Sequence, residues 1–269
     1  MGENVVLARY RLHMQAAGLS PRTIETREQL LAVFLQGRRP DEVSRDDVIA
    51  FLANPDYAAG TRSNYFSMLR GFFDWTLAEQ LIVEHPMVGM VKPRKPPCVP
   101  HPVSNEQLAR VLATPMRPAV RVQILLAAYA GLRVHEIAKL HADDYQERRL
   151  RVRGKGGRVD EIPVPVLLGN VLDDMPTSGF WFPHHEDPNR PINRKSVTDA
   201  IRKVMRRAGV NASAHALRHW YATTLLREGV DIRVVQSLMR HASLGTTAGY
   251  LAITSAARDA AVEQLPVAA

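Results

Sequence analysis

The sequence predicts a mainly α-helical protein of two domains, the second of which also holds a small β-hairpin. Apolar residues recur at helical spacing behind recognisable N-cap residues over most of the chain. A proline-rich stretch between His85 and Pro102 interrupts this pattern, and two alternating, β-branched stretches flank a glycine-rich turn at residues 154–157. With 269 residues, of which 46% are hydrophobic, the chain is long enough to build two modest cores.

Helix starts are well marked in the first domain, which we expect to span residues 1–90. Ser20 before Pro21 is an N-cap residue followed by proline at the first helical position. Ser44 opens another helix, because its spacing to Asp47 is that of a capping box. This domain is therefore expected to consist of helices separated by clear stops.

A further helix of the first domain is expected from about Gly60 to Leu81. Its apolar residues recur at helical spacing and predict a buried face. They are Tyr65, Met68, Leu69, Phe72, Phe73 and Leu77. The same helix leaves Arg62 and Arg70 to solvent or to a partner.

Residues 91–102 are predicted to form an extended linker between the domains. Prolines lack the amide hydrogen that a helix needs, and six of them lie between His85 and Pro102. Lys92, Arg94 and Lys95 make the same stretch basic. Two interpretations stay open, a spacer only or a basic strap that lies along DNA phosphates.

The second domain is expected over residues 103–254. Ser104 and Gln107 have capping-box spacing and open a helix, and a longer apolar helix runs from about Ala119 to Ala130 and ends at Gly131. A later helix carries one apolar face. That face contains Val197, Ile201 and Val204.

The β-hairpin is predicted from two alternating stretches of this second domain. They are Arg149 to Arg153 and Arg158 to Val164, and Gly154-Lys155-Gly156-Gly157 forms the turn between them. The hairpin is therefore the only β-structure that we expect.

The charge of the chain favours a polyanionic partner. Its 35 lysines and arginines exceed its 27 aspartates and glutamates, for a net charge of +8. Residues 1–91 carry 9 basic and 11 acidic side chains, whereas residues 103–269 carry 23 and 16. The positive excess therefore lies in the linker and in the second domain.

Cysteine content and hydropathy indicate which cellular compartment to expect for the protein. The single cysteine, Cys98, excludes an internal disulfide framework and a cysteine-cluster metal site. No apolar run approaches the roughly 20 residues that span a bilayer, and the N-terminus lacks a basic-then-apolar signal peptide. We expect a cytoplasmic protein with no membrane partner.

Several short motifs are weak signals when each is taken alone. Gly131-Leu132-Arg133 is compatible with an ordinary helix end, and the turn around Lys155 lacks the full spacing of a nucleotide-binding P-loop. His215 and His219 are four residues apart, as zinc ligands are, but Ala216 stands where a metalloprotease needs a glutamate base. Metal and ATP sites are therefore disfavoured.

Taken together and in order, these segments resemble the tyrosine recombinase, or phage-type integrase, family. The resemblance covers residues 104–250, and the helical first segment is similar in size to the family's core-site-binding domain. The matched positions are Arg133 with Glu136 in the first box, Lys155 in the hairpin, His215 and Arg218 in the His-x-x-Arg box, and His241 nine residues before Tyr250. Arg240 departs from the family, which usually has glycine there.

The resemblance implies a two-domain clamp around duplex DNA and a phosphotyrosyl reaction without metal, ATP or another cofactor. Tyr250 would attack the phosphodiester to give a 3′-phosphotyrosyl link, with His215 as its base and Lys155 as the acid for the leaving 5′-oxygen. Arg133, Arg218 and His241 would bind the phosphate oxygens, because guanidinium groups stay charged and bind phosphate bidentately. Glu136 would orient these donors.

DNA contacts outside this set are expected from both domains. The candidates are Arg62, Asn64, Arg70, Lys92, Arg94, Lys95 and Arg240. At position 240 a side chain is expected either to point away from the site or to contact a DNA phosphate. The tail, residues 255–269, is predicted to hold a helix that packs on its own domain or docks into a neighbouring protomer.

The biological role is expected to be that of a phage or mobile-element integrase. The resemblance implies a homotetramer on two paired DNA sites, with an accessory directionality factor as a further partner. The alternatives are a host recombinase that resolves chromosome dimers and, less favoured, a type IB topoisomerase. A topoisomerase shares the tyrosine and the arginine-rich site, but the order of boxes and the small helical first domain favour a recombinase.

Overall fold

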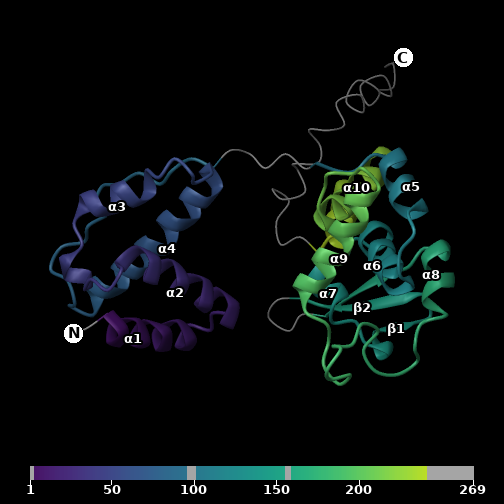
Figure 1. Cartoon of the computed structure of the whole chain (residues 1–269), viewed down its shortest axis with the longest axis horizontal. Coiled ribbons are helices and arrows are strands. Elements are labelled where there is room, and N and C mark those ends of the chain that lie inside the picture. Colours follow the sequence, from purple (N-terminus) through teal and green to yellow (C-terminus); the bar gives the residue numbers. More distant parts are fainter. Residues whose placement is uncertain (1–2, 96–100, 155–158, 241–269) are drawn as a thin grey trace, which may run out of the picture. The chain divides into compact units, whose positions relative to one another are not determined.

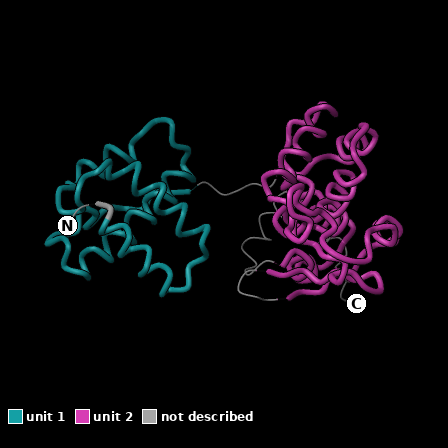
Figure 2. The backbone as a smooth tube through the Cα atoms, turned by 60° about the horizontal axis from the view of Figure 1, so that its bottom comes forward, with its two compact units in different colours: residues 1–97 teal, residues 98–269 magenta. Residues whose placement is uncertain are grey.

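Two compact units make up the chain, and the computed structural model describes residues 3–95, 101–154 and 159–240 of it. The units comprise residues 1–97 and 98–269, so that the division falls within the linker expected at 91–102 (Figure 2). The described residues are mostly helical and include one three-stranded antiparallel sheet (Figure 1). This confirms the predicted fold class.

Unit 1 is helical over its described residues. Its elements are α1 Glu3–Ala16, α2 Pro21–Leu35, a 3₁₀ turn Pro40–Glu42, α3 Arg45–Leu52 and α4 Ala59–Ala78. The Ser20 hydroxyl accepts a hydrogen bond from the Thr23 amide, and the Ser44 hydroxyl accepts one from the Asp47 amide, each at 3.2 Å. Both predicted helix starts are therefore confirmed.

Helix α4 ends three residues earlier than expected. Gln80 adopts a left-handed backbone conformation with φ of 56°, and the Leu81 amide donates to the Thr76 carbonyl at 2.9 Å. This six-to-one hydrogen bond closes the helix end and turns the chain away from the helix axis. Sequence alone missed the stop because no glycine marks it.

The core of unit 1 is rich in aromatic side chains. Phe72 and Phe73 of α4 are fully buried, and the Phe72 ring packs edge-on against Tyr10 of α1 at 5.2 Å between centroids. Leu77 was expected in this core, but it is 39% exposed, while Phe66 is buried two turns after the start of α4. The prediction for Leu77 is wrong because the buried face in the last turn of α4 runs through Thr76, and Leu77 lies off that face.

Unit 2 combines helices with the small sheet. Its elements are α5 Asn105–Ala113, α6 Pro118–Tyr129, α7 Val134–Ile137, a 3₁₀ turn Ala142–Asp144, β1 Tyr145–Gln146, β2 Arg149–Arg153, β3 Val159–Pro163, α8 Val166–Leu172, α9 Arg194–Arg207, α10 Ala214–Arg227 and α11 Ile232–Leu238. In the view of Figure 1 the labelled strands lie toward the lower part of this unit, with α5 and α10 toward the upper part.

The strands form the predicted hairpin and one additional short strand. The order is β1-β2-β3, all antiparallel, with Leu150 opposite Ile162 in β3. Along β2 buried and exposed residues alternate, so that Leu150 and Val152 face the core while the arginines face solvent. The turn around Lys155 lies outside the described residues.

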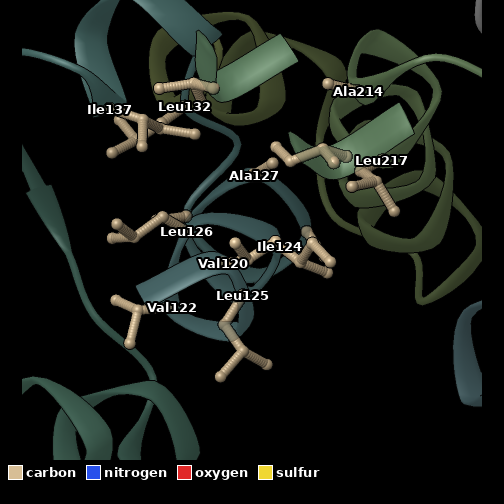
Figure 3. Close-up of a cluster of buried hydrophobic side chains, with 14 of the residues drawn as sticks. Val120, Val122, Ile124, Leu125, Leu126, Ala127, Leu132, Ile137, Ala214 and Leu217 are labelled. Atoms are coloured by element: carbon tan, nitrogen blue, oxygen red, sulfur yellow. The ribbon is translucent and has the colours of Figure 1, made fainter. Parts of the chain in front are cut away.

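Helix α6 forms the centre of the core of unit 2. It packs against α7, α8, α9 and α10. Figure 3 shows its apolar side chains, among them Ile124 and Leu126, together with Leu217 of α10 and Ile137 of α7, all members of one buried cluster. A helix that is apolar on all sides in this way belongs inside a domain. Among the described residues, no helix combines the length and apolarity needed to cross a membrane.

We expect Leu126→Ala to lower the free energy of unfolding by about 2–5 kcal/mol, because it removes a fully buried side chain from the centre of this cluster. Leu167→Ala is the matched control, since Leu167 is 57% exposed and should change stability by less than about 0.5 kcal/mol. Urea denaturation measures both. Equal losses would show that α6 is not the centre of the core.

Candidate active site

Arg218 is the most deeply buried charged residue of the site. It lies in the second turn of α10 and is only 1% exposed. Its guanidinium donates hydrogen bonds to the carbonyls of Gly131, which follows α6, and Met239, which follows α11. A buried charge is tolerated only when it is hydrogen-bonded, so these carbonyls fix three segments of the chain around one side chain.

Gly131 is required at its position for two reasons. Its φ is +60°, and a Cβ atom there would lie 2.6 Å from the Tyr221 ring of α10. The Leu132 amide donates to the Leu126 carbonyl at 3.2 Å, which closes the end of α6. The turn therefore presents the Gly131 carbonyl to Arg218.

Arg133 and Glu136 form a capping box at the start of α7. The Glu136 carboxylate accepts the Arg133 amide at 2.7 Å and the Arg133 guanidinium at 2.9 Å. The Glu136 side chain is 1% exposed and that of Arg133 is 32% exposed. Arg133 therefore reaches the surface while the carboxylate that holds it lies beneath.

The surroundings of Glu136 favour its charged form. Burial alone would raise the pKa of this carboxyl, but the nearby arginines, Arg240 foremost, and the amide that it accepts bring that pKa below its ordinary value. At neutral pH Glu136 is therefore an anion among cations.

His215 lies one turn before Arg218 on α10 and keeps an exposed edge. Partial burial lowers its pKa, and the charges of Arg218 and Arg133 lower it further. Its ring also packs against that of His219 at 4.2 Å between centroids. A lowered pKa keeps the imidazole neutral at pH 7, the form that accepts a proton.

The side chain of Arg240 lies within the site. The expectation that this side chain points away from the site is therefore wrong. The side chain is 4% exposed and donates to Glu136 Oε2 at 2.7 Å and, more weakly, to the Gly131 carbonyl at 3.4 Å. The buried carboxylate provides the physical reason, because an anion in the interior attracts the nearest available cation. The structure presents this guanidinium to Glu136 rather than to solvent.

Three of the predicted catalytic residues lie outside the described residues. They are Lys155, His241 and Tyr250. The predicted tail helix at 255–269 also lies outside them. The described site therefore consists of Arg133, Glu136, His215, Arg218 and Arg240.

A cavity of about 560 Å³ adjoins Glu136, and its lining combines the cations Lys139, Arg151 and Arg153 with the carboxylates of Asp143 and Asp144. Sequence reasoning missed these three cations. Lys139 follows α7, whereas Arg151 and Arg153 are exposed along β2. Arg151 donates to the Asp143 carbonyl, and Arg153 lies 3.5 Å from Asp144. Every exposed position of β2 is an arginine, and this sequence pattern could have identified two of the cations, Arg151 and Arg153.

The predicted DNA-contacting residues of unit 1 differ in the solvent exposure of their side chains. Asn64, Arg70 and the linker cations Lys92, Arg94 and Lys95 are exposed. Arg62 was expected to lie open, but it is half-buried and donates to the carbonyls of Leu52 at 2.7 Å and Asn54 at 3.1 Å. Its guanidinium satisfies carbonyls at the end of α3, so the expectation that it is left to solvent is wrong, and its contact with DNA stays a prediction.

The fold and the site define a class of protein. The partly exposed Arg133 and the exposed His215 lie near the buried Arg218, and two guanidinium groups beside a neutral imidazole suit a phosphodiester anion. Among the described residues, no group of three or more potential ligands is placed to hold a metal ion. The arginines and the histidine define the class as enzymes that act on a phosphate ester.

Comparison with known proteins identifies the family. The model of the phage integrase family matches residues 103–256. The tyrosine recombinase XerA of Pyrococcus furiosus is 30% identical over 277 residues, which cover 96% of this chain and 93% of that protein. The chain therefore belongs to the phage integrase family of tyrosine recombinases, which are site-specific recombinases that cleave and rejoin DNA.

Solved structures agree with this assignment. The integrase from mycobacterium phage Brujita is 35% identical, with a TM-score of 0.52, and the match covers 96% of this chain and 91% of that one. A lambda integrase tetramer bound to a Holliday junction is 16% identical with a TM-score of 0.73, and the match covers 90% and 78% of the two chains. The second likeness concerns the fold alone.

We expect Gly131→Ala to destabilise unit 2 by about 1–3 kcal/mol more than Gly209→Ala does, because only at Gly131 must an aromatic ring give way. Gly209 is the matched control, since its φ of +69° imposes the same left-handed strain in open space. Thermal unfolding measures both, and equal losses would contradict the role of the Tyr221 contact.

Proposed function

We propose that this chain is the integrase of a phage or mobile element, which cuts and rejoins DNA strands through a phosphotyrosyl link at Tyr250. The observation that carries the proposal is the convergence of Arg133 and Arg218 beside His215. The buried Arg218 supplies a rigidly held positive charge and Arg133 a partly exposed guanidinium, so that a phosphodiester would approach two positive charges that are in place before it binds.

The proposed reaction exchanges one phosphoester bond for another. The Tyr250 oxygen attacks the phosphorus and loses its proton to His215, while the 5′-oxygen leaves with a proton from Lys155. The product is a 3′-phosphotyrosyl link and a free 5′-hydroxyl, and the hydroxyl of a partner strand reverses the step. His241 adds a hydrogen bond to the phosphate, and no cofactor enters the balance.

The lowered pKa of His215 supports its role as the base. A histidine with its ordinary pKa of about 6.5 would already be partly protonated near neutral pH. Burial and the two arginines shift this titration to lower pH, so that His215 accepts a proton from tyrosine over a wider range. Activity is expected to fall as the pH drops through this lowered pKa.

We place duplex DNA against both units. The exposed cations of the linker and of β2 would contact phosphates, with Asn64 and Arg70 as contacts from unit 1. The lambda integrase tetramer on a Holliday junction supports a homotetramer on two paired sites. An accessory directionality factor and a location with the DNA in the bacterial cytoplasm complete the proposal.

The biological role has two candidates with separate support. The Brujita phage integrase, 35% identical over 96% of this chain, favours the integrase role. XerA of Pyrococcus furiosus, 30% identical over the same share, supports a host recombinase as the second candidate. The target DNA distinguishes them.

We expect covalent trapping on genomic DNA to recover one short site, because the phosphotyrosyl link attaches the cut strand to the protein. Purified protein is incubated with sheared DNA of the source organism, retained with its attached DNA under denaturing conditions, and the DNA is sequenced. Tyr250→Phe is the control and should retain none. A site at the border of a phage or mobile element supports the integrase, and a site in the host chromosome far from such elements supports the second candidate.

We expect Arg133→Ala and Arg218→Ala each to slow formation of this covalent link by about 10²- to 10³-fold, because each removes one phosphate donor. Binding to the recovered duplex should remain near normal for Arg133→Ala, whose side chain is partly exposed. Arg206→Ala, at an exposed position of α9, is the matched control. Plasmid relaxation without joining of two duplexes would contradict the recombinase role.

A further inference from the structure

Arg240 combines two features that proteins rarely place in one residue. Its φ is +53°, a left-handed conformation that side chains disfavour. Its side chain is also 4% exposed, whereas the side chain of Arg148 is 41% exposed and the other described residues of this kind, Gln36, Gln80 and Glu147, are exposed. Such a strained and buried arginine persists only where its surroundings hold it.

Two partners of Arg240 also hold the two phosphate-binding arginines, and a third, the Leu238 carbonyl at 3.0 Å, belongs to the end of α11. Glu136 Oε2 accepts Arg240 at 2.7 Å and the Arg133 amide at 2.7 Å, while Oε1 accepts the Arg133 guanidinium at 2.9 Å. The Gly131 carbonyl accepts Arg218 and lies 3.4 Å from Arg240. Arg240 thus touches the supports of both donors without being one of them.

We propose that Arg240 is a positioning residue of the recombination reaction, which holds Arg133 through Glu136 and Arg218 through the shared Gly131 carbonyl. The role rests on the proposed function of these two arginines as phosphate donors. Because Met239, which precedes Arg240, also gives its carbonyl to Arg218, the end of α11 is fastened to the turn between α6 and α7. Glycine at position 240 would remove the strain and the side-chain contacts of Arg240 to Glu136 and Gly131, and it would leave the Met239 carbonyl in place.

The charges that face Glu136 decide how the role can be tested. Arg133 comes from its own turn, Arg218 from α10 and Arg240 from the end of α11. The titratable groups that line the cavity beside it are Lys139, His141, Asp143, Asp144, Arg151 and Arg153. His135 of α7 also feels the Glu136 charge. Of these cations, Arg240 and Arg133 contact the carboxylate, at 2.7 Å and 2.9 Å between the guanidinium and carboxylate atoms.

Removal of Arg240 should therefore make Glu136 easier to protonate. Burial opposes the charge of Glu136, and the Arg240 charge is the largest influence that keeps it ionised. In Arg240→Gly the carboxyl titrates at higher pH, and once protonated it releases Arg133. The acid limb of the pH–rate profile begins with the protonation of His215, and in this variant the second fall, caused by protonation of Glu136, moves to higher pH. A purely structural role would lower the melting temperature alone.

The test has two measurements on the full-length chain. Carbon-13 NMR follows the Glu136 carboxyl in DNA-free protein, with Glu136→Gln to assign its resonance, and covalent trapping on the recovered duplex gives the pH–rate profile. We expect Arg240→Gly to raise the Glu136 midpoint by about 1–3 pH units and to move the acid limb in the same direction. Arg240→Lys, which keeps the charge, should restore most of both.

Two controls separate positioning from other effects. Arg148→Gly removes another arginine with positive φ, 57°, whose partners are Asn170 and Asp173, and it should leave the acid limb unchanged. In a Glu136→Gln background, Arg240→Gly should no longer move the acid limb, because glutamine does not titrate. If Arg240→Gly fails to fold, Arg240→Gln carries the same two measurements.

Different outcomes overturn different claims. If the active wild-type protein and Arg240→Gly share one Glu136 midpoint, or if the midpoint moves while the acid limb does not, the positioning role is overturned and the proposed function stands. If the wild-type protein forms no covalent link to DNA, the proposed function is overturned, and this role for Arg240 with it.

Discussion

The burial of the Arg218 guanidinium is the constraint on which the site depends. A charge that is 1% exposed must be hydrogen-bonded, and the available acceptors are the carbonyls of Gly131 and Met239. These carbonyls lie 108 residues apart in the chain, and one side chain brings them together. The left-handed turn at Gly131, the end of α11 and the second turn of α10 are therefore parts of one structure.

Charge balance explains why this structure suits a phosphodiester. Three arginines meet a single buried carboxylate, Glu136, so the cluster carries an excess of positive charge. Partial burial lowers the pKa of His215, the charges of Arg218 and Arg133 lower it further, and its ring stays neutral. A phosphate anion would supply the missing negative charge. The same excess of positive charge would thus favour both phosphate binding and catalysis.

Local features of the fold followed from the sequence because their causes are local. The N-caps at Ser20, Ser44 and Ser104, and the alternation along β2, each depend on residues within one turn or one strand. The expectations that were wrong depended on contacts between elements. Leu77 turns out to be exposed, and Arg62 is engaged by carbonyls at the end of another helix.

The sequence by itself determined the helical class, the hairpin and the division into two units, and its resemblance to the family indicated Arg133, Glu136, His215 and Arg218 as candidate site residues. It did so because residue types at fixed spacing reflect both local structure and chemistry. Only the tertiary structure decided the place of Arg240. Arg240 lies far from Glu136 in the sequence. No local sequence pattern indicates that an arginine will adopt a strained left-handed backbone conformation and contact a buried carboxylate. That preference arises from the low polarity of the interior, where an unpaired anion is costly.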